Sequence, residues 1–94
     1  MYESKLRSPE TDRLFDAILN LPDREACYRF FEDLCTISEL TAMTQRLEVA
    51  RLLAEGKTFA QITAETGVSS ATITRVNRCL SYGSGGYRCA LESK

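Results

Sequence analysis

The segment from Ser69 to Arg78 carries hydroxyl, methyl and guanidinium groups and no acidic side chain. Short side chains allow a helix backbone to approach base edges, and the methyl groups of Ala or Thr can contact the methyl group of thymine. Guanidinium groups and the free amides of a helix N-terminus can bind phosphates. The pattern therefore predicts a helix that reads the major groove of DNA, with Ser70, Ala71 and Thr74 nearest the bases. The candidate DNA-binding residues are Gln61, Ser69, Ser70, Ala71, Thr72, Thr74, Arg75 and Arg78.

Residues 58–80 have the pattern of two short helices joined by a sharp turn. Thr58-Phe-Ala-Gln61 is a capping box that opens the first helix. Gly67 suits the positive φ of a tight turn, and Ser69 can cap a second helix over residues 70–80. The layout predicts a helix-turn-helix, although it also fits a helical corner that only packs. The residues predicted to pack the two helices together are Ile62, Thr66, Val68, Ile73, Val76 and Leu80.

The residues before this motif predict three further helices. Ser8-Pro9-Glu10 combines an N-cap with residues suited to a first helical turn. Residues 20–23 are expected to end this first helix and to begin a second one. Thr36 and Glu39 have the spacing of a second capping box, which would open a helix of roughly 17 residues ending at Gly56. No stretch of the sequence has a β-strand pattern. The expected fold class is therefore all-α, a helical bundle that contains a helix-turn-helix.

The chain has the length of one domain, which we expect to cover residues 1–94. Residues 8–56 are expected to form dimerisation helices, residues 58–80 the helix-turn-helix, and residues 81–94 a Gly-rich loop with a short C-terminal helix. A chain of this length buries only a modest core, and its first two helices have little to cover their apolar faces, so dimerisation is favoured. The Gly-rich residues 83–86 lack the Lys-Ser/Thr of a phosphate-binding loop and predict a flexible link.

The charges are divided unevenly along the chain. Residues 1–56 carry seven Lys or Arg against eleven Asp or Glu, whereas residues 57–94 carry five against two, although the whole chain has a net charge of −1. A positive second part favours a polyanionic partner such as double-stranded DNA. Three arginines also fit an ordinary solvated surface, so the alternative is a helical protein-interaction module that does not bind DNA.

Several classes of function are excluded by what the sequence lacks. It has no histidine and no Cys-x-x-Cys pair, so neither a zinc site nor any other metal site is expected, and no nucleophile has an evident base, so an enzyme is not expected. The N-terminus has no apolar signal segment, and no run is long enough to span a membrane, which predicts a cytoplasmic protein. The cysteines are expected to be free thiols: Cys27, Cys35, Cys79 and Cys89.

The run Gly67-Val-Ser-Ser-Ala-Thr-Ile-Thr-Arg75 resembles the recognition helix of the Trp repressor family. The residues that follow, up to Tyr87, resemble the YerC/YecD branch of Trp-repressor-like proteins, and the resemblance extends from Leu14 to Leu91. It implies an all-helical, intertwined homodimer that presents two recognition helices to successive major grooves of a palindromic operator. It also implies a transcriptional regulator that acts as a repressor.

The same resemblance implies a pocket for a small-molecule corepressor. An arginine pair suits such a pocket, because two guanidinium groups can clamp a carboxylate and stack on a flat ring. Val76 stands where the family has a glycine beside the ring, so its branched side chain could fill that space, and tryptophan is only one candidate corepressor. Arg46 also fits a solvated charge near Glu39 or Glu48. No cofactor is otherwise expected, and the candidate ligand-binding residues are Thr36, Arg46 and Arg75.

Overall fold

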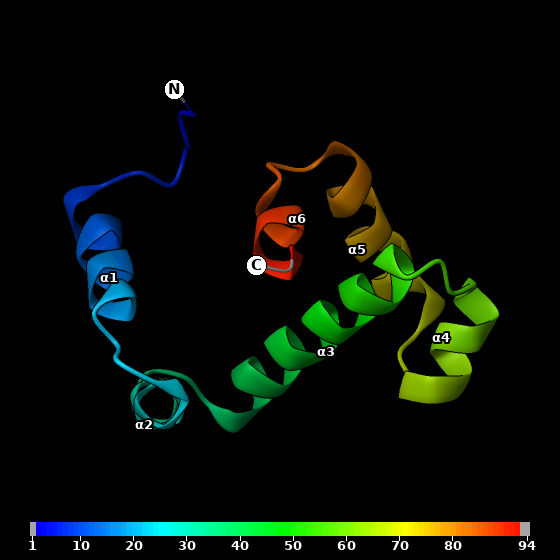
Figure 1. Ribbon diagram of the computed structural model, residues 1–94, viewed down its shortest axis with the longest axis horizontal. Helices are drawn as coiled ribbons and strands as arrows, with labels where there is room; N and C mark the ends of the chain where they lie inside the picture. The colour runs from blue at the N-terminus through cyan, green and yellow to red at the C-terminus, as the bar shows by residue number, and fades with distance from the viewer. Residues whose placement is uncertain (1, 93–94) are drawn as a thin grey trace. The chain divides into compact units, whose positions relative to one another are not determined.

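Helices are the only regular secondary structure in residues 2–92, the part of the chain that the computed structural model describes. The predicted all-α fold class is therefore confirmed. Residues 1, 93 and 94, at the ends of the predicted domain and of segment 81–94, lie outside the described residues. The chain divides into two units, one ending at Thr36 and the other beginning at Ile37. The helices, labelled in Figure 1, are α1 (Pro9–Leu19), α2 (Arg24–Leu34), α3 (Ile37–Ala54), α4 (Phe59–Thr66), α5 (Ser70–Tyr82) and α6 (Gly86–Leu91).

Side-chain caps begin both helices of the N-terminal unit, and the first is the one that the sequence predicts. The Ser8 hydroxyl accepts a hydrogen bond from the Thr11 amide at 3.0 Å at the start of α1. The Asp23 carboxylate accepts one from the Ala26 amide at 2.9 Å at the start of α2. Each bond satisfies an amide that the first turn of a helix leaves without a backbone partner.

The N-terminal unit has apolar side chains but no core of its own. Neither α1 nor α2 contains a buried residue. Phe15 is 52% exposed and Leu19 is 81% exposed, and the Phe30 and Phe31 rings contact each other edge to face with centroids 5.5 Å apart. Exposed apolar side chains of this size are typical of an interaction surface. The apolar residues of α1 and α2 are therefore a candidate surface for a partner.

The C-terminal unit is built around α3, which spans 18 residues, close to the predicted length. Gly56, with a φ of 88°, follows its last turn, and the Lys57 amide donates to the Leu52 carbonyl at 3.1 Å. The glycine thus ends the helix in the left-handed conformation, which other residues rarely adopt. The shorter helices α4, α5 and α6 gather along α3 (Figure 1).

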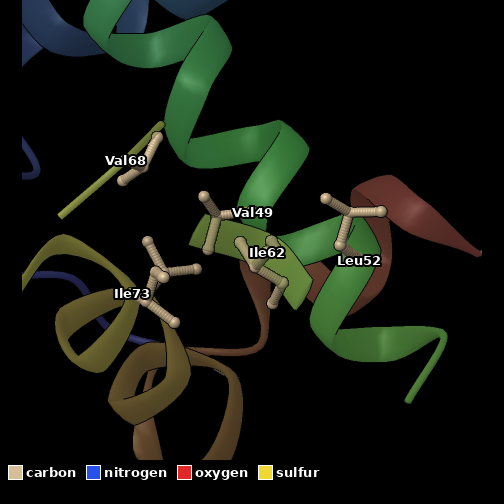
Figure 2. Packing of buried hydrophobic residues seen from close by; sticks show 7 residues of the cluster. Val49, Leu52, Ile62, Val68 and Ile73 are labelled. Carbon is tan, nitrogen blue, oxygen red and sulfur yellow. The ribbon is translucent and has the colours of Figure 1, made fainter. Parts of the chain in front are cut away.

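A single cluster of buried hydrophobic residues holds this unit together. In Figure 2 the side chains of Val49, Ile62 and Ile73 meet from α3, α4 and α5. Four of the predicted packing positions are buried, while Thr66 and Leu80 are half-buried. Because both helices of the helix-turn-helix pack on α3, the motif is held rigidly. The buried residues are Val49, Ala50, Leu52, Ile62, Val68, Ile73 and Val76.

α5 ends two residues later than predicted. The sequence prediction placed its end at Leu80, but the helix continues to Tyr82 and is followed by Gly83, whose amide donates to the Cys79 carbonyl at 2.9 Å. A side chain on Gly83 would collide with that carbonyl oxygen. Gly83 has no side chain, so it can approach the Cys79 carbonyl closely at the point where α5 ends.

α6 is the short C-terminal helix expected after the Gly-rich loop. Its residues Tyr87 and Leu91, one turn apart, pack against the core cluster. The Arg88 Nε atom donates a hydrogen bond to the Leu80 carbonyl at 3.1 Å. This bond and the two side chains attach α6 to the helix that carries the candidate DNA-binding residues.

Candidate DNA interface

The turn between α4 and α5 depends on the left-handed backbone of Gly67. This residue has φ 73° and ψ 6°, and its amide donates to the Thr63 carbonyl at 2.9 Å. A Cβ atom placed there would meet nothing within 4 Å, so the conformation, and not lack of space, favours glycine. The Thr66 hydroxyl donates to the Ile62 carbonyl at 2.7 Å and accepts from the Val68 amide at 3.1 Å. The backbone of Gly67 and the hydroxyl bonds of Thr66 together stabilise the turn between α4 and α5.

Both helices of the motif have the predicted caps. The Gln61 amide donates to the Thr58 hydroxyl at 3.1 Å, and the Thr58 amide donates to Gln61 Oε1 at 2.8 Å, which completes the capping box. At the start of α5 the Thr72 amide donates to the Ser69 hydroxyl at 3.3 Å. Gln61, a candidate DNA-binding residue, is thus exposed but uses its side-chain oxygen within the cap.

The outward face of α5 follows from which of its residues are buried. Ile73 is 0% and Val76 is 2% exposed, so these two define the side that packs on the core. Successive residues of a helix are rotated by about 100°, which places Ala71 nearly opposite them. We define the outward face of α5 as the exposed residues around that direction, namely Ala71, Thr74, Arg75 and Arg78.

The remaining candidates lie at the N-terminal end of α5, where it enters the turn. Ser69 and Ser70 are exposed, whereas Thr72 is half-buried on the side facing α3. The structure therefore brings most of the predicted residues of α5 onto one face and its adjoining end, with Thr72 set back from them.

Two arginines on the outward face give it a positive charge. Within residues 2–92 neither Arg75 nor Arg78 forms an ion pair. Arg51 on α3 behaves differently, since it binds the carboxylates of both Glu48 and Glu55. Its hydrogen bond lowers the pKa of Glu48, which keeps that carboxylate ionised beside the guanidinium. The charges of α5 remain available for an external anion, whereas that of Arg51 is already neutralised.

The structure brings together two of the three candidate ligand-binding residues. Arg46 on α3 and Arg75 on α5 line one cavity of about 100 Å³. Thr36, the third candidate, belongs to the other unit. Val76 points into the hydrophobic core, where it is 2% exposed. The cavity is smaller than the roughly 300 to 1,000 Å³ of typical ligand sites, which suits one carboxylate group. Its lining residues are Ala42, Gln45, Arg46, Thr72 and Arg75.

Sequence reasoning missed one residue near these sites. Gln45 lines the cavity beside Arg46 but belongs to no recognisable motif. Tyr82, which the sequence offers as a further DNA or dimer contact, is 87% exposed at the C-terminal end of α5. It lies eleven residues after Ala71 and therefore on the same side of the helix.

Residues 2–92 contain no group of three or more His, Cys, Asp or Glu placed to hold a metal ion. The cysteines there are free thiols, with Cys79 and Cys89 exposed. None of the helices between residues 2 and 92 combines the length and apolar character needed to cross a bilayer.

Comparison with known proteins agrees with this geometry. Residues 9–94 match the family model described as Trp repressor protein. The chain is 58% identical over 92 residues to the protein YerC of Bacillus subtilis (strain 168), covering 98% of this chain and 88% of that protein. A capped, glycine-turned pair of helices in an all-helical chain defines a helix-turn-helix protein. The chain belongs to the Trp repressor family, and the resemblance to its YerC/YecD branch is confirmed.

Two solved structures have the same fold. A candidate Trp repressor from Staphylococcus aureus superposes with a TM-score of 0.86 at 46% identity, covering 100% of this chain and 99% of that one. A TrpR-like protein from Eubacterium eligens ATCC 27750 gives 0.87 at 45% identity, covering 98% and 100%. The family suggests a DNA-binding regulator, and its fold is that of regulators and not of enzymes.

Proposed function

We propose that this protein is a cytoplasmic, homodimeric transcriptional repressor that reads a palindromic operator with α5 of each protomer. The outward face of α5 is the observation that carries the proposal. It is positively charged, exposed and held by two caps and a left-handed glycine turn. A helix presented in this way can enter the major groove with its N-terminal residues nearest the bases.

The chemistry of the candidate residues supports two different roles. Arg75 and Arg78 would bind phosphates, together with the amides at the N-terminus of α5. Ser70, Ala71 and Thr74 are short enough to let the helix approach the bases. Gln61 would add a contact from α4 through its side-chain NH₂ group, since its oxygen is used in the capping box.

The homodimer is supported by the apolar surface of the N-terminal unit. Exposed Phe15 and Leu19 on α1 and Leu34 on α2 would be covered by a second copy of the chain. A twofold dimer presents two copies of α5, and a protein with that symmetry recognises a palindrome. Dimerisation and operator symmetry are therefore parts of one proposal.

Control by a small molecule is supported by the cavity between α3 and α5. Because Arg75 both lines that cavity and lies on the outward face, an anion bound there would bias the position of a DNA-binding side chain. A corepressor carrying a carboxylate fits this site. Tryptophan remains one candidate among such compounds.

Selection of random duplex DNA by the purified protein, with and without a metabolite mixture, tests this function. We expect one enriched palindrome, protected in footprinting, and repression of a reporter whose promoter overlaps it. A selection without any enriched sequence would contradict the proposed function.

The alternative, a protein-interaction module, is favoured by the apolar surface of α2. Under that alternative, substitution of Phe30 or Phe31 would damage binding more than substitution of Arg75, and the affinity for the partner would not depend on salt. Binding of one duplex site with strong salt dependence would exclude it.

A further inference from the structure

Hydroxyl groups dominate the N-terminal half of α5, but most of them are used within the protein. Ser69 Oγ accepts from the Thr72 amide at 3.3 Å and shares a hydrogen bond with Thr72 Oγ1 at 3.2 Å. The Thr74 hydroxyl donates to the Ser70 carbonyl at 2.9 Å. Within residues 2–92, the Ser70 side chain is the one in this half-helix whose hydroxyl forms no such hydrogen bond. Few hydroxyl groups of α5 are therefore left to form hydrogen bonds with bases.

The bond made by Thr74 also determines what this side chain presents outward. Its only hydroxyl hydrogen is used, and its oxygen is turned back toward the helix backbone. The methyl group is then the part of the exposed side chain that is available to a partner. Ala71 lies one turn earlier, at a spacing that puts the Cβ atoms of such pairs about 5 to 6 Å apart. Ala71 and Thr74 together form a small apolar surface, flanked by Arg75 and Arg78.

We infer that this methyl surface, Ala71 with the methyl group of Thr74, reads the C5 methyl group of thymine in the operator. The inference rests on the proposed function and adds the chemical feature that the outward face of α5 recognises. In the major groove thymine is distinguished from cytosine by its O4 acceptor and its methyl group, and the methyl group requires no hydrogen bond from the protein. Arg75, beside this surface, and Arg78, one turn beyond Thr74, would hold the helix to the phosphates while the methyl groups meet.

Replacement of thymine by uracil isolates the methyl group, because uracil keeps every hydrogen-bonding group of thymine. The probe is the palindrome obtained by selection, with uracil placed at one thymine position of both half-sites at a time. We expect affinity at fixed salt to fall at one or two positions by about fourfold for each methyl group no longer buried. 5-Methylcytosine at such a position should bind more tightly than cytosine, because it restores the methyl group.

Protein variants assign the effect to α5. Thr74→Ser keeps the hydroxyl and its bond to Ser70 but removes the methyl group, so it should weaken binding to the thymine site and leave binding to the uracil site unchanged. Thr74→Val keeps a methyl group without the hydroxyl and should preserve the preference for thymine. Thr44→Ser is the matched control, because Thr44 on α3 makes the same bond, to Leu40 at 2.9 Å. It should bind both sites like the parent protein.

The possible outcomes separate the inference from the function on which it depends. Absence of any selected site removes both. A selected site without thymine in its half-sites, or one whose affinity is unchanged by uracil at every position, overturns the inference and leaves the function intact. Uracil sensitivity that persists unchanged in both Thr74→Ser and Ala71→Gly, checked for folding by melting temperature, also overturns it.

Discussion

Arg46 on α3 and Arg75 on α5 line the same small cavity, so two positively charged residues border one space. Within residues 2–92 neither of them forms an ion pair. Glu48, one of the two acidic residues expected near Arg46, is bound by Arg51. Two like charges that share a cavity favour an anion between them, because the anion attracts both. This arrangement connects a candidate ligand site directly to the helix proposed to read DNA.

Substitution of Arg46 should therefore remove stabilisation by a carboxylate ligand. A panel of carboxylates and amino acids, tryptophan included, should contain a compound that raises the melting temperature of the parent protein. At 100 times its dissociation constant, such a ligand stabilises by about 2.7 kcal/mol. Arg46→Ala should lose the shift, while Arg78→Ala, on the same helix as Arg75 but outside the cavity, should retain it. If no compound shifts the parent protein, the pair is ordinary surface charge.

The outward arginines of α5 should determine how DNA binding depends on salt. Each phosphate contact contributes about 0.9 to the slope of log affinity against log salt concentration, so a contact made by both protomers contributes about twice that. Arg75→Ala and Arg78→Ala should each reduce the slope by roughly this amount in titrations at several salt concentrations. Arg29→Ala serves as the control, because Arg29 lies on α2 and is paired with Glu25. Unchanged slopes in both α5 variants would argue against phosphate contacts by these residues.

The turn glycine should be difficult to replace. Gly67→Ala places a side chain on a left-handed residue, at a cost of roughly 1 to 2 kcal/mol, and should lower the midpoint of urea unfolding and weaken DNA binding. Gly86→Ala is the matched control, since Gly86 begins α6 without a positive φ and an added Cβ would meet only Ser84 Oγ at 4.0 Å. It should be neutral or stabilise by about 0.5 kcal/mol. Equal destabilisation by the two substitutions would show that φ is not the reason for Gly67.

The helix caps should contribute measurably to the stability of the motif. Thr58→Ala and Ser69→Ala each remove an N-cap oxygen, and each should cost about 1 kcal/mol of unfolding free energy. Ser69→Ala should also weaken DNA binding, because it loosens the end of α5 that approaches the bases. Thr63→Ala, an exposed substitution in the middle of α4, should stay within about 0.5 kcal/mol of the parent protein. Cap variants as stable as Thr63→Ala would contradict this account.

Local features of the fold could be predicted from the sequence, because short-range interactions determine them. The capping box at Thr58 and the left-handed Gly67 each depend on a few neighbouring residues, and both were found as expected. The end of α5 was predicted too early, because the stop depends on close approach of Gly83 to the helix end. Helical spacing alone does not reveal that contact.

The site was less predictable where it depends on packing between helices. The spacing of α5 indicated that Ile73 and Val76 would be buried, and they are. The cavity that joins Arg46 to Arg75 depends on how α3 and α5 cross, which no local pattern encodes. Thr74 was expected to lie near the bases, with its methyl and hydroxyl groups both considered, but its hydroxyl donates to the carbonyl of Ser70. Side-chain bonds to a helix's own backbone compete with external partners, and the sequence does not show which will form.

The apolar surface of the N-terminal unit should control dimerisation. Phe15→Glu places a charge where a 52% exposed ring is expected to meet a second copy of the chain. Burial of one such ring contributes about 1.5 to 3 kcal/mol, so the variant should shift the protein from dimer toward monomer in sedimentation velocity at micromolar concentration. Arg13→Glu introduces the same carboxylate on the opposite side of α1 and should leave the dimer intact. A parent protein that sediments as a monomer, or a Phe15→Glu variant that dimerises normally, would show that this surface has another partner.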